Sequence, residues 1–175
     1  MKDIGSYRKS YDKSELLAAV ADVDAIIIRS DKITREVMDA AKQLKIVVRA
    51  GAGYDNVDLA AATEKGVTVM NTPGQNSNAV AELALGMMVL KARNKYSGKA
   101  GTELKDKNLG IHAYGNVGRL VGNIAKGFGM KIFAFDPFVD KSSIEKDGVT
   151  ALDSVEALYE KCQYISLHIP ANDKT

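Results

Sequence analysis

The sequence predicts an α/β fold in which parallel strands are covered by helices. From Asp24 onward, short runs of β-branched residues alternate with stretches whose apolar residues follow helical spacing. This alternation is typical of strand–helix–strand units. In the second half of the chain, one strand-like run leads through a glycine-containing turn directly into an amphipathic helix. Both observations favour parallel over antiparallel sheets.

Three strands and three helices are expected before residue 75. The strand runs 25–28, 46–48 and 67–70 are rich in Ile and Val and are interpreted as buried. The helical stretches are 15–20, 34–44 and 58–65. Residues 1–12 contain no strand-like run ahead of the first helix, so we expect the N-terminus of this domain to be incomplete.

The stretch 79–90 is helical in pattern and apolar almost all round. Such a helix is expected to be buried on several sides, between two domains or between subunits, and a homodimer is therefore plausible. The basic segment 91–107 follows it and contains loop signals around Gly98. We interpret this segment as a solvated linker, with an anion-attracting patch as the alternative. The expected domains are 1–97 and 98–175, the second incomplete at its C-terminus.

After this linker we expect strands at 109–113, 131–135 and 165–169, and a helix at 116–128. The first strand and the helix are joined by Ala113, Tyr114, Gly115, Asn116, Val117 and Gly118. This turn has the pattern of a dinucleotide-binding glycine fingerprint, with Ala113 in place of the first glycine. Gly115 allows a pyrophosphate to approach the backbone, and Gly118 allows the helix to pack close to the strand. Ala113 is compatible with these roles provided that its position does not need a positive φ.

Asp136 ends the second strand of this unit, where the fingerprint places an acid that accepts hydrogen bonds from a ribose, about 20 residues further on. Pro137 and Phe138 follow, and no arginine is present there to receive a 2′-phosphate. The pattern therefore favours NAD over NADP. A turn that merely needs small residues and a methyltransferase that binds S-adenosylmethionine remain alternatives.

The segment 49–58 is glycine-rich and polar at the end of a buried strand. Its backbone N–H groups are suited to an anion-binding nest to which Arg49 adds charge. The alternative is a turn whose glycines only satisfy backbone geometry.

Several class assignments are excluded by composition. The chain has 24 Lys and Arg against 22 Asp and Glu, a formal net charge of +2, so nucleic acid is not an expected partner. Cys162 is the only cysteine, which excludes an internal disulfide and a multi-thiolate metal site, and we assign it to packing. The apolar run 79–90 is too short to cross a membrane, and the N-terminus lacks the apolar core of a secretory signal. The expected compartment is the cytoplasm, with no metal and no membrane partner.

Seven motifs, taken in order, resemble the D-isomer-specific 2-hydroxyacid dehydrogenases over residues 24–175. They are Ile28-Arg29-Ser30, the loop 49–58, Asn71-Thr72-Pro73-Gly74, Asn78-Ala79-Val80-Ala81-Glu82, the turn 113–118, Asp136-Pro137 and Ser166-Leu167-His168-Ile169-Pro170. The resemblance implies a flavodoxin-like substrate domain followed by the first part of a doubly wound, NAD-binding Rossmann domain. It further implies NAD-dependent oxidation of a D-2-hydroxy acid, with 3-phosphoglycerate, the precursor of serine, as the expected substrate.

The resemblance also assigns roles to individual residues. Arg29 and Ser30 hold the substrate phosphate, and the backbone of Arg49, Ala50, Gly51, Ala52 and Gly53 holds its carboxylate. The cofactor contacts are Val80, the turn residues Tyr114, Gly115, Asn116, Val117 and Gly118, and then Asp136, Pro137, His168, Pro170 and Thr175.

No catalytic residue is assigned within this chain. In the family that it resembles, the Arg, Glu and His that carry out the reaction follow the segment 167–170. His168 is expected to contact cofactor and not to transfer a proton, and His112 is expected to be a hydrogen-bonded structural residue. We therefore expect the 175-residue polypeptide to be inactive by itself. An NAD(H)-binding regulatory module without catalysis is the alternative.

Overall fold

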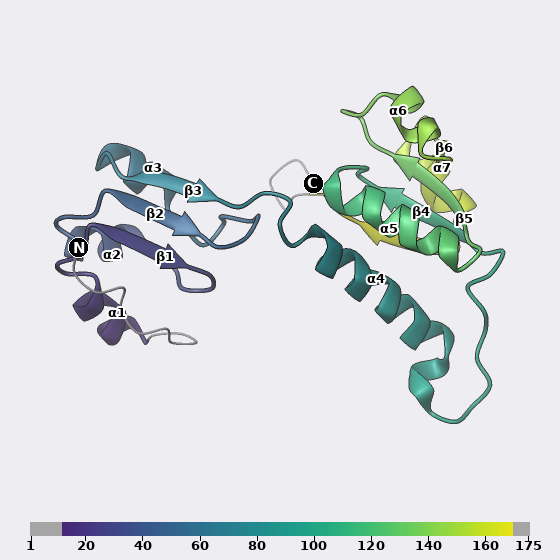
Figure 1. The fold of residues 1–175 in the computed structure, drawn as a ribbon, viewed down its shortest axis with the longest axis horizontal. Helices are drawn as coiled ribbons and strands as arrows, with labels where there is room; N and C mark the ends of the chain where they lie inside the picture. Colours follow the sequence, from purple (N-terminus) through teal and green to yellow (C-terminus); the bar gives the residue numbers. More distant parts are fainter. Residues whose placement is uncertain (1–11, 170–175) are drawn as a thin grey trace. The chain divides into compact units, whose positions relative to one another are not determined.

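The computed structural model describes residues 12–169. The chain forms two compact units, Met1–Gln75 and Asn76–Thr175 (Figure 1). Each unit has its own parallel sheet and its own hydrophobic core. The division differs from the boundary expected near Gly98 because the long helix that follows residue 76 packs on a helix of the second unit.

The first unit contains a three-stranded parallel sheet in the order β1-β2-β3. Its elements are α1 (Lys13–Ala19), β1 (Ala25–Ile28), α2 (Arg35–Ala40), β2 (Ile46–Arg49), α3 (Leu59–Glu64) and β3 (Thr68–Asn71). The three strands and three helices expected from the sequence are all present. Their bounds differ by a few residues, most at the end of α2, where the helix stops at Ala40 because the backbone of Ala41 leaves the helical region.

The two outer strands of this sheet carry exposed residues, which corrects the expectation of three buried strands. Val47 in β2 is fully buried, whereas Ile27 in β1 is 73% exposed and Met70 in β3 is 52% exposed. Successive side chains of a strand point to opposite faces. In the described part of the chain, the outer strands are therefore covered on one face only, the face to which Ile28 contributes.

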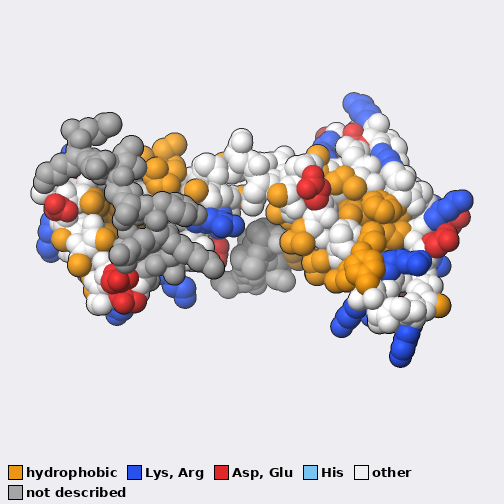
Figure 2. All heavy atoms as spheres, turned by 60° about the horizontal axis from the view of Figure 1, so that its bottom comes forward, with side chains coloured by type: hydrophobic (Ala, Val, Ile, Leu, Met, Phe, Trp, Pro, Cys, Tyr) orange, Lys and Arg blue, Asp and Glu red, His pale blue; other side chains and the backbone are white. Residues whose placement is uncertain are grey.

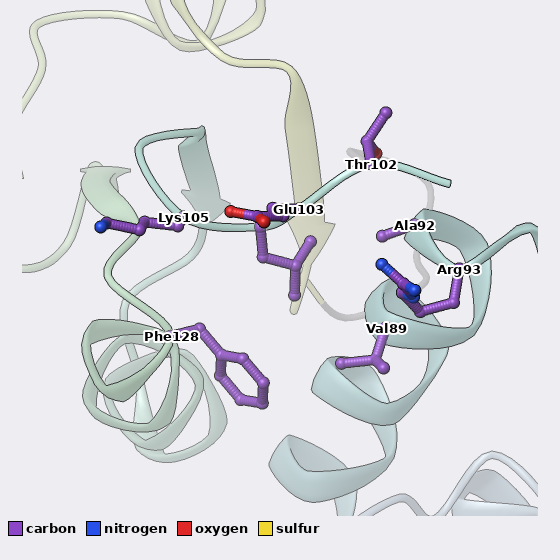
Figure 3. Close-up of a pocket in the computed structure, with 8 residues that line it drawn as sticks. Val89, Ala92, Arg93, Thr102, Glu103, Lys105 and Phe128 are labelled. Atoms are coloured by element: carbon purple, nitrogen blue, oxygen red, sulfur yellow. The ribbon is translucent and has the colours of Figure 1, made fainter. Parts of the chain in front are cut away.

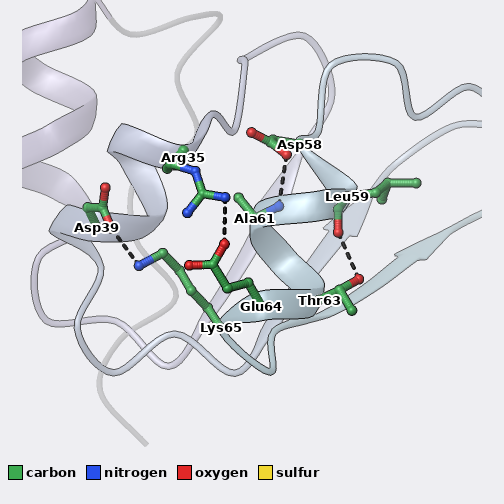
Figure 4. Close-up of polar contacts among 8 residues, drawn as sticks. All are labelled: Arg35, Asp39, Asp58, Leu59, Ala61, Thr63, Glu64 and Lys65. Atoms are coloured by element: carbon green, nitrogen blue, oxygen red, sulfur yellow. Dashed lines mark hydrogen bonds and ion pairs between the residues drawn. The ribbon is translucent and has the colours of Figure 1, made fainter.

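Charged side chains link the two helices α2 and α3 on the surface of this unit (Figure 4). Arg35 lies 2.7 Å from Glu64, and Lys65 lies 2.5 Å from Asp39. The hydrogen bond to Arg35 lowers the pKa of Glu64, and the bond to Lys65 lowers that of Asp39. The Asp58 side chain caps the N-terminus of α3. Because these groups are exposed, the pairs fix the helix ends more than they add stability.

The second unit contains a four-stranded parallel sheet in the order β6-β5-β4-β7. Its elements are α4 (Ser77–Ala92), η1 (Asn94–Tyr96), β4 (Asn108–His112), α5 (Asn116–Gly127), β5 (Lys131–Phe135), α6 (Lys141–Lys146), β6 (Thr150–Ala151), α7 (Val155–Lys161) and β7 (Tyr164–Leu167). The expected strands and the α5 helix are confirmed. The elements α6, β6 and α7 were not predicted, since the segment 136–163 is mostly polar and shows little periodicity.

Helix α4 is buried along one face only. Its buried apolar residues are Ala81, Leu85, Met88 and Ala92, which join the core of the second unit. On other faces, apolar residues remain exposed: Val80, Leu83, Met87 and Leu90. Figure 2 shows hydrophobic side chains gathered over this side of the unit. Burial on several sides, expected from the sequence, is thus absent within the described chain. No helix between residues 12 and 169 has the length and apolarity needed to cross a membrane.

Candidate functional site

The turn between β4 and α5 presents an uncapped helix N-terminus. Gly115 is the N-cap residue of α5, and no side chain caps this end of the helix. Both Gly115 and Asn116 are exposed, and a Cβ atom added at Gly115 would meet open space. The first N–H groups of a helix have no intrahelical partner and favour an anion. The turn therefore has the geometry of a phosphate-binding turn.

Gly118 is required for the close packing of α5 on β4. A Cβ atom at this position would lie 2.4 Å from the Ala113 carbonyl oxygen and 3.0 Å from the Ile111 Cγ2 atom. The packing role that the sequence suggested for Gly118 is confirmed. Val117, beside it, is half-buried against the core.

Ala113 has a φ of 78°, in the left-handed region that favours glycine. The sequence argument required that this position not need a positive φ, and the structure does not meet that condition. The left-handed conformation costs an L-residue roughly 1–2 kcal/mol. The Ala113 N–H is held by the Phe135 carbonyl oxygen at 2.9 Å, so the strained backbone is fixed to the neighbouring strand.

Asp136 is held in place by two backbone N–H groups. Tyr114 N–H donates to its Oδ2 atom and Phe138 N–H donates to its Oδ1 atom, each at 2.8 Å. Each carboxylate oxygen can accept more than one hydrogen bond. Asp136 is thus oriented by the turn while its oxygens keep lone pairs for further hydrogen bonds. Pro137 follows it and is exposed.

Tyr114 does not offer its side chain to a ligand, although the sequence placed it among the cofactor contacts. Its side chain is fully buried, and its hydroxyl donates to the Asp147 Oδ2 atom at 3.2 Å. Burial, together with the negative charge of Asp147, raises the pKa of Tyr114 to about 12. Sequence reasoning missed Asp147 and its second partner, Arg119. Neither belongs to a motif, and only the fold brings Asp147 to the turn.

The two histidines lie at the carboxyl ends of adjacent strands. His168 N–H donates to the His112 carbonyl oxygen at 2.9 Å, and its Nε2 atom lies 2.9 Å from Ser166 Oγ. Burial lowers the pKa of His168. The His112 Nδ1 atom lies 2.9 Å from the Tyr159 hydroxyl, which confirms the expected hydrogen-bonded role of His112.

The other predicted cofactor contacts lie on α4 or outside the described residues. Val80 lies near the N-terminus of α4 and is 38% exposed. Pro170 and Thr175 lie outside the described residues.

In the first unit, the predicted substrate residues meet at the carboxyl ends of β1 and β2. Ile28 pairs with Arg49 in the parallel register, and Arg29 and Ser30 directly follow Ile28. Arg29 and Ser30 are exposed. The fold thus brings both arginines to one edge of one sheet.

Arg49 lies directly over the backbone of Gly51. A Cβ atom at Gly51 would fall 1.4 Å from an Arg49 guanidinium nitrogen, so a larger residue there would displace the arginine side chain. The Arg49 Nε atom is buried and has no hydrogen-bond partner among the described residues. A buried guanidinium N–H without a partner is costly, and an anionic ligand would supply the missing acceptor.

The nest expected at this loop is smaller than the sequence suggested. Ala50 N–H donates to the Ile28 carbonyl oxygen at 2.7 Å, and Gly51 N–H donates to the Arg49 carbonyl oxygen at 2.9 Å. These two groups are consequently engaged within the protein. In the described structure, the N–H groups of Ala52 and Gly53 are the ones left to face a ligand.

Two shallow hollows are lined by other residues, although Asn71 in the smaller one donates its Nδ2–H to the Ala52 carbonyl oxygen at 2.7 Å. The larger, of about 260 Å³, lies in the second unit between the ends of α4 and α5, and Phe128, Arg93 and Val89 contribute to its walls (Figure 3). The smaller, of about 150 Å³, lies in the first unit and includes Tyr54 and Asn71. Neither contains a predicted site residue. Across residues 12–169, no group of three or more His, Cys, Asp or Glu side chains is placed to hold a metal ion.

Comparison with known proteins supports the resemblance inferred from the motifs. The family model described as D-isomer specific 2-hydroxyacid dehydrogenase, catalytic domain, matches residues 2–166. The chain belongs to this family. Among solved structures of the family, the NAD⁺-bound 3-phosphoglycerate dehydrogenase of Entamoeba histolytica is 46% identical, with a TM-score of 0.86, over 95% of this chain and 53% of that one. The α/β fold with parallel sheets is thereby confirmed.

Two curated relatives in the family have different names. D-3-phosphoglycerate dehydrogenase of Methanocaldococcus jannaschii is 40% identical over 93% of this chain and 34% of its own length. Hydroxypyruvate reductase of Thermotoga maritima is 39% identical over 94% of this chain and 57% of its own length. The chain thus spans between one third and somewhat over one half of these relatives.

Proposed function

We propose that this chain binds NAD and a phosphorylated D-2-hydroxy acid for the NAD-dependent oxidation of that acid, with 3-phosphoglycerate as substrate and 3-phosphohydroxypyruvate as product. The single observation that carries the proposal is the turn between β4 and α5 with Asp136 hydrogen-bonded to it. The names of two D-3-phosphoglycerate dehydrogenases that are 40% and 38% identical to this chain support the choice of substrate.

The second unit has the features that NAD needs. The open backbone at Gly115 and the uncapped N-terminus of α5 are suited to the pyrophosphate. Asp136, held from two sides, is suited to the adenosine ribose, and its negative charge disfavours the 2′-phosphate of NADP. NAD, when bound, supplies the hydride acceptor. The role of these residues is to bind and orient it.

The first unit supplies two cations for a small dianionic acid. Arg29 is exposed at the sheet edge and is assigned to the phosphate, together with Ser30. Arg49, with its unpartnered Nε atom, and the N–H groups of Ala52 and Gly53 are assigned to the carboxylate. Anchoring a substrate at both ends fixes its orientation as well as its charge. The group that accepts the hydroxyl proton is not assigned among these residues, so we expect binding without turnover from the 175-residue polypeptide.

The exposed apolar face of α4 is assigned to a homodimer. Leu83 and Met87 are 64% and 61% exposed, and they lie one turn apart on helix α4. Apolar side chains that are exposed together mark interaction surfaces. We assign the protein to the cytoplasm, as a metabolic dehydrogenase.

Titration calorimetry with NADH and NADPH tests the cofactor assignment. We expect NADH to bind at least about tenfold more tightly than NADPH, because Asp136 repels a 2′-phosphate. Asp136→Asn should narrow this preference. Asp153→Asn is the matched control, since Asp153 is exposed in the same unit and pairs with Lys141. Failure of the wild-type chain to bind NADH, or tighter binding of S-adenosylmethionine, would contradict the proposal.

Titration with 3-phosphoglycerate and D-glycerate tests the substrate assignment. Arg29→Ala should weaken binding of 3-phosphoglycerate about ten- to hundredfold, the loss of one or two charged hydrogen bonds, and should leave D-glycerate nearly unchanged. Arg35→Ala is the matched control, because Arg35 is an exposed arginine of the same unit that pairs with Glu64. Equal losses for both acids would remove the phosphate role from Arg29.

A further inference from the structure

Tyr114 contacts the segment that follows β5 at both of its ends. We name residues 136–147, which run from Asp136 through α6 to Asp147, the β5–α6 segment. The Tyr114 N–H donates to Asp136 at 2.8 Å, and its hydroxyl donates to Asp147 at 3.2 Å. One residue of the phosphate-binding turn therefore holds the first and the last residue of this segment.

The Asp147 end of this contact is a partly buried polar cluster. Arg119, on the first turns of α5, donates to the same Asp147 Oδ2 atom at 3.1 Å, and its guanidinium lies 5.3 Å from the centre of the Tyr114 ring. The Lys126 ammonium group donates to the Asp147 carbonyl oxygen. Because Arg119 forms an ion pair with Asp147, we expect the turn to bind phosphate through its backbone N–H groups.

The Tyr114 hydroxyl is poorly explained by packing alone. Its side chain is among the largest that are fully buried, and a buried hydroxyl is costly unless it is hydrogen-bonded. A phenylalanine ring would fill the same space without a polar partner. The hydroxyl therefore contributes a specific connection, between the turn and the far end of the β5–α6 segment.

We propose that Tyr114 is a positioning residue for the dinucleotide: through its bonds to Asp136 and Asp147 it sets the distance between the phosphate-binding turn and the ribose acceptor. This inference rests on the proposed function, in which the turn binds pyrophosphate and Asp136 binds ribose. A ligand that contacts both groups at once binds more tightly when the distance between them is fixed before it binds. The affinity of a ligand that contacts only one of them does not depend on that distance.

The test compares Tyr114→Phe with the wild-type chain in binding ADP, which spans both groups, and adenosine, which reaches only the ribose acceptor. We expect the affinity advantage of ADP over adenosine to fall about three- to tenfold, the range of one hydrogen bond. The effect is limited because Ile144, which is buried, also anchors the segment. Tyr164→Phe is the matched control: it removes a hydroxyl from a half-buried tyrosine at the opposite end of the sheet.

Four outcomes distinguish this inference from its premise. If the wild-type chain binds neither ADP nor NADH, the proposed function fails. If the wild type binds and Tyr114→Phe keeps the full advantage of ADP, the positioning role is overturned. Equal weakening of ADP and adenosine would indicate a general structural role and would also overturn it. If Tyr114→Phe does not fold, Asp147→Asn, which weakens the same contact from its other side, is measured in its place with the same expected loss.

Discussion

The substitution Gly118→Ala should separate α5 from β4 and destabilise the second unit. The added Cβ atom would lie 2.4 Å from the Ala113 carbonyl oxygen, about 1 Å short of an ordinary contact, which begins at 3.4 Å. The opposing atom is backbone, and it belongs to a residue already in the left-handed region, so the strand cannot yield easily. The helix must move instead.

Overpacking of this kind costs about 1–3 kcal/mol. For a unit of this size, each kcal/mol lowers the melting temperature by roughly 4–8 °C. We therefore expect a loss of several degrees in thermal unfolding followed by circular dichroism. The same shift moves the first N–H groups of α5 away from the turn, so NADH binding should weaken more than tenfold at a temperature where the variant is folded.

Gly127→Ala is the matched control, because Gly127 ends the same helix and an added Cβ would have nothing within 4 Å. Alanine is the better helix former by up to about 1 kcal/mol, so this variant should be as stable as the wild type or more stable. If Gly118→Ala melts at the wild-type temperature and binds NADH normally, the argument from close packing is refuted.

Three further predictions follow from other parts of the structure. Ala113→Gly should raise the free energy of unfolding by about 1 kcal/mol, since glycine adopts a positive φ without strain; chemical denaturation measures this, and a loss of stability would contradict it. Burial lowers the pKa of His168 below its ordinary 6.5, so the unfolded chain binds a proton first as the pH falls through 6.5. The melting temperature should consequently fall toward pH 5, and less steeply in His168→Gln; equal slopes would refute this. We expect the wild type to be a dimer in analytical ultracentrifugation and the double variant Leu83→Glu, Met87→Glu to be a monomer, and an unchanged mass would remove α4 from the interface.

Local sequence patterns were sufficient to predict features that depend on residues close together in the sequence. The strands were predicted from runs of β-branched residues, and the turn was recognised from Gly115, Gly118 and the helix that follows them. Patterns were insufficient for the short elements α6, β6 and α7: β6 is formed by pairing with β5, and α6 and α7 are each anchored by one buried residue, Ile144 and Leu158. They also misjudged burial in β1 and α4, since hydrophobicity does not report how many faces an element covers.

By itself, the sequence determined the parallel α/β class, the glycine-containing turn, the acid that follows it and the membership of a dehydrogenase family, because each depends on residue types at short, regular spacing. The tertiary structure decided what those residues do at their positions. In it, the Tyr114 ring is buried in the core and its hydroxyl contacts Asp147. The Arg49 side chain lies over Gly51, and its Nε atom has no partner among the described residues. The burial of Tyr114 and its contact with Asp147 arise from the packing of elements distant in the chain, and no local spacing encodes them.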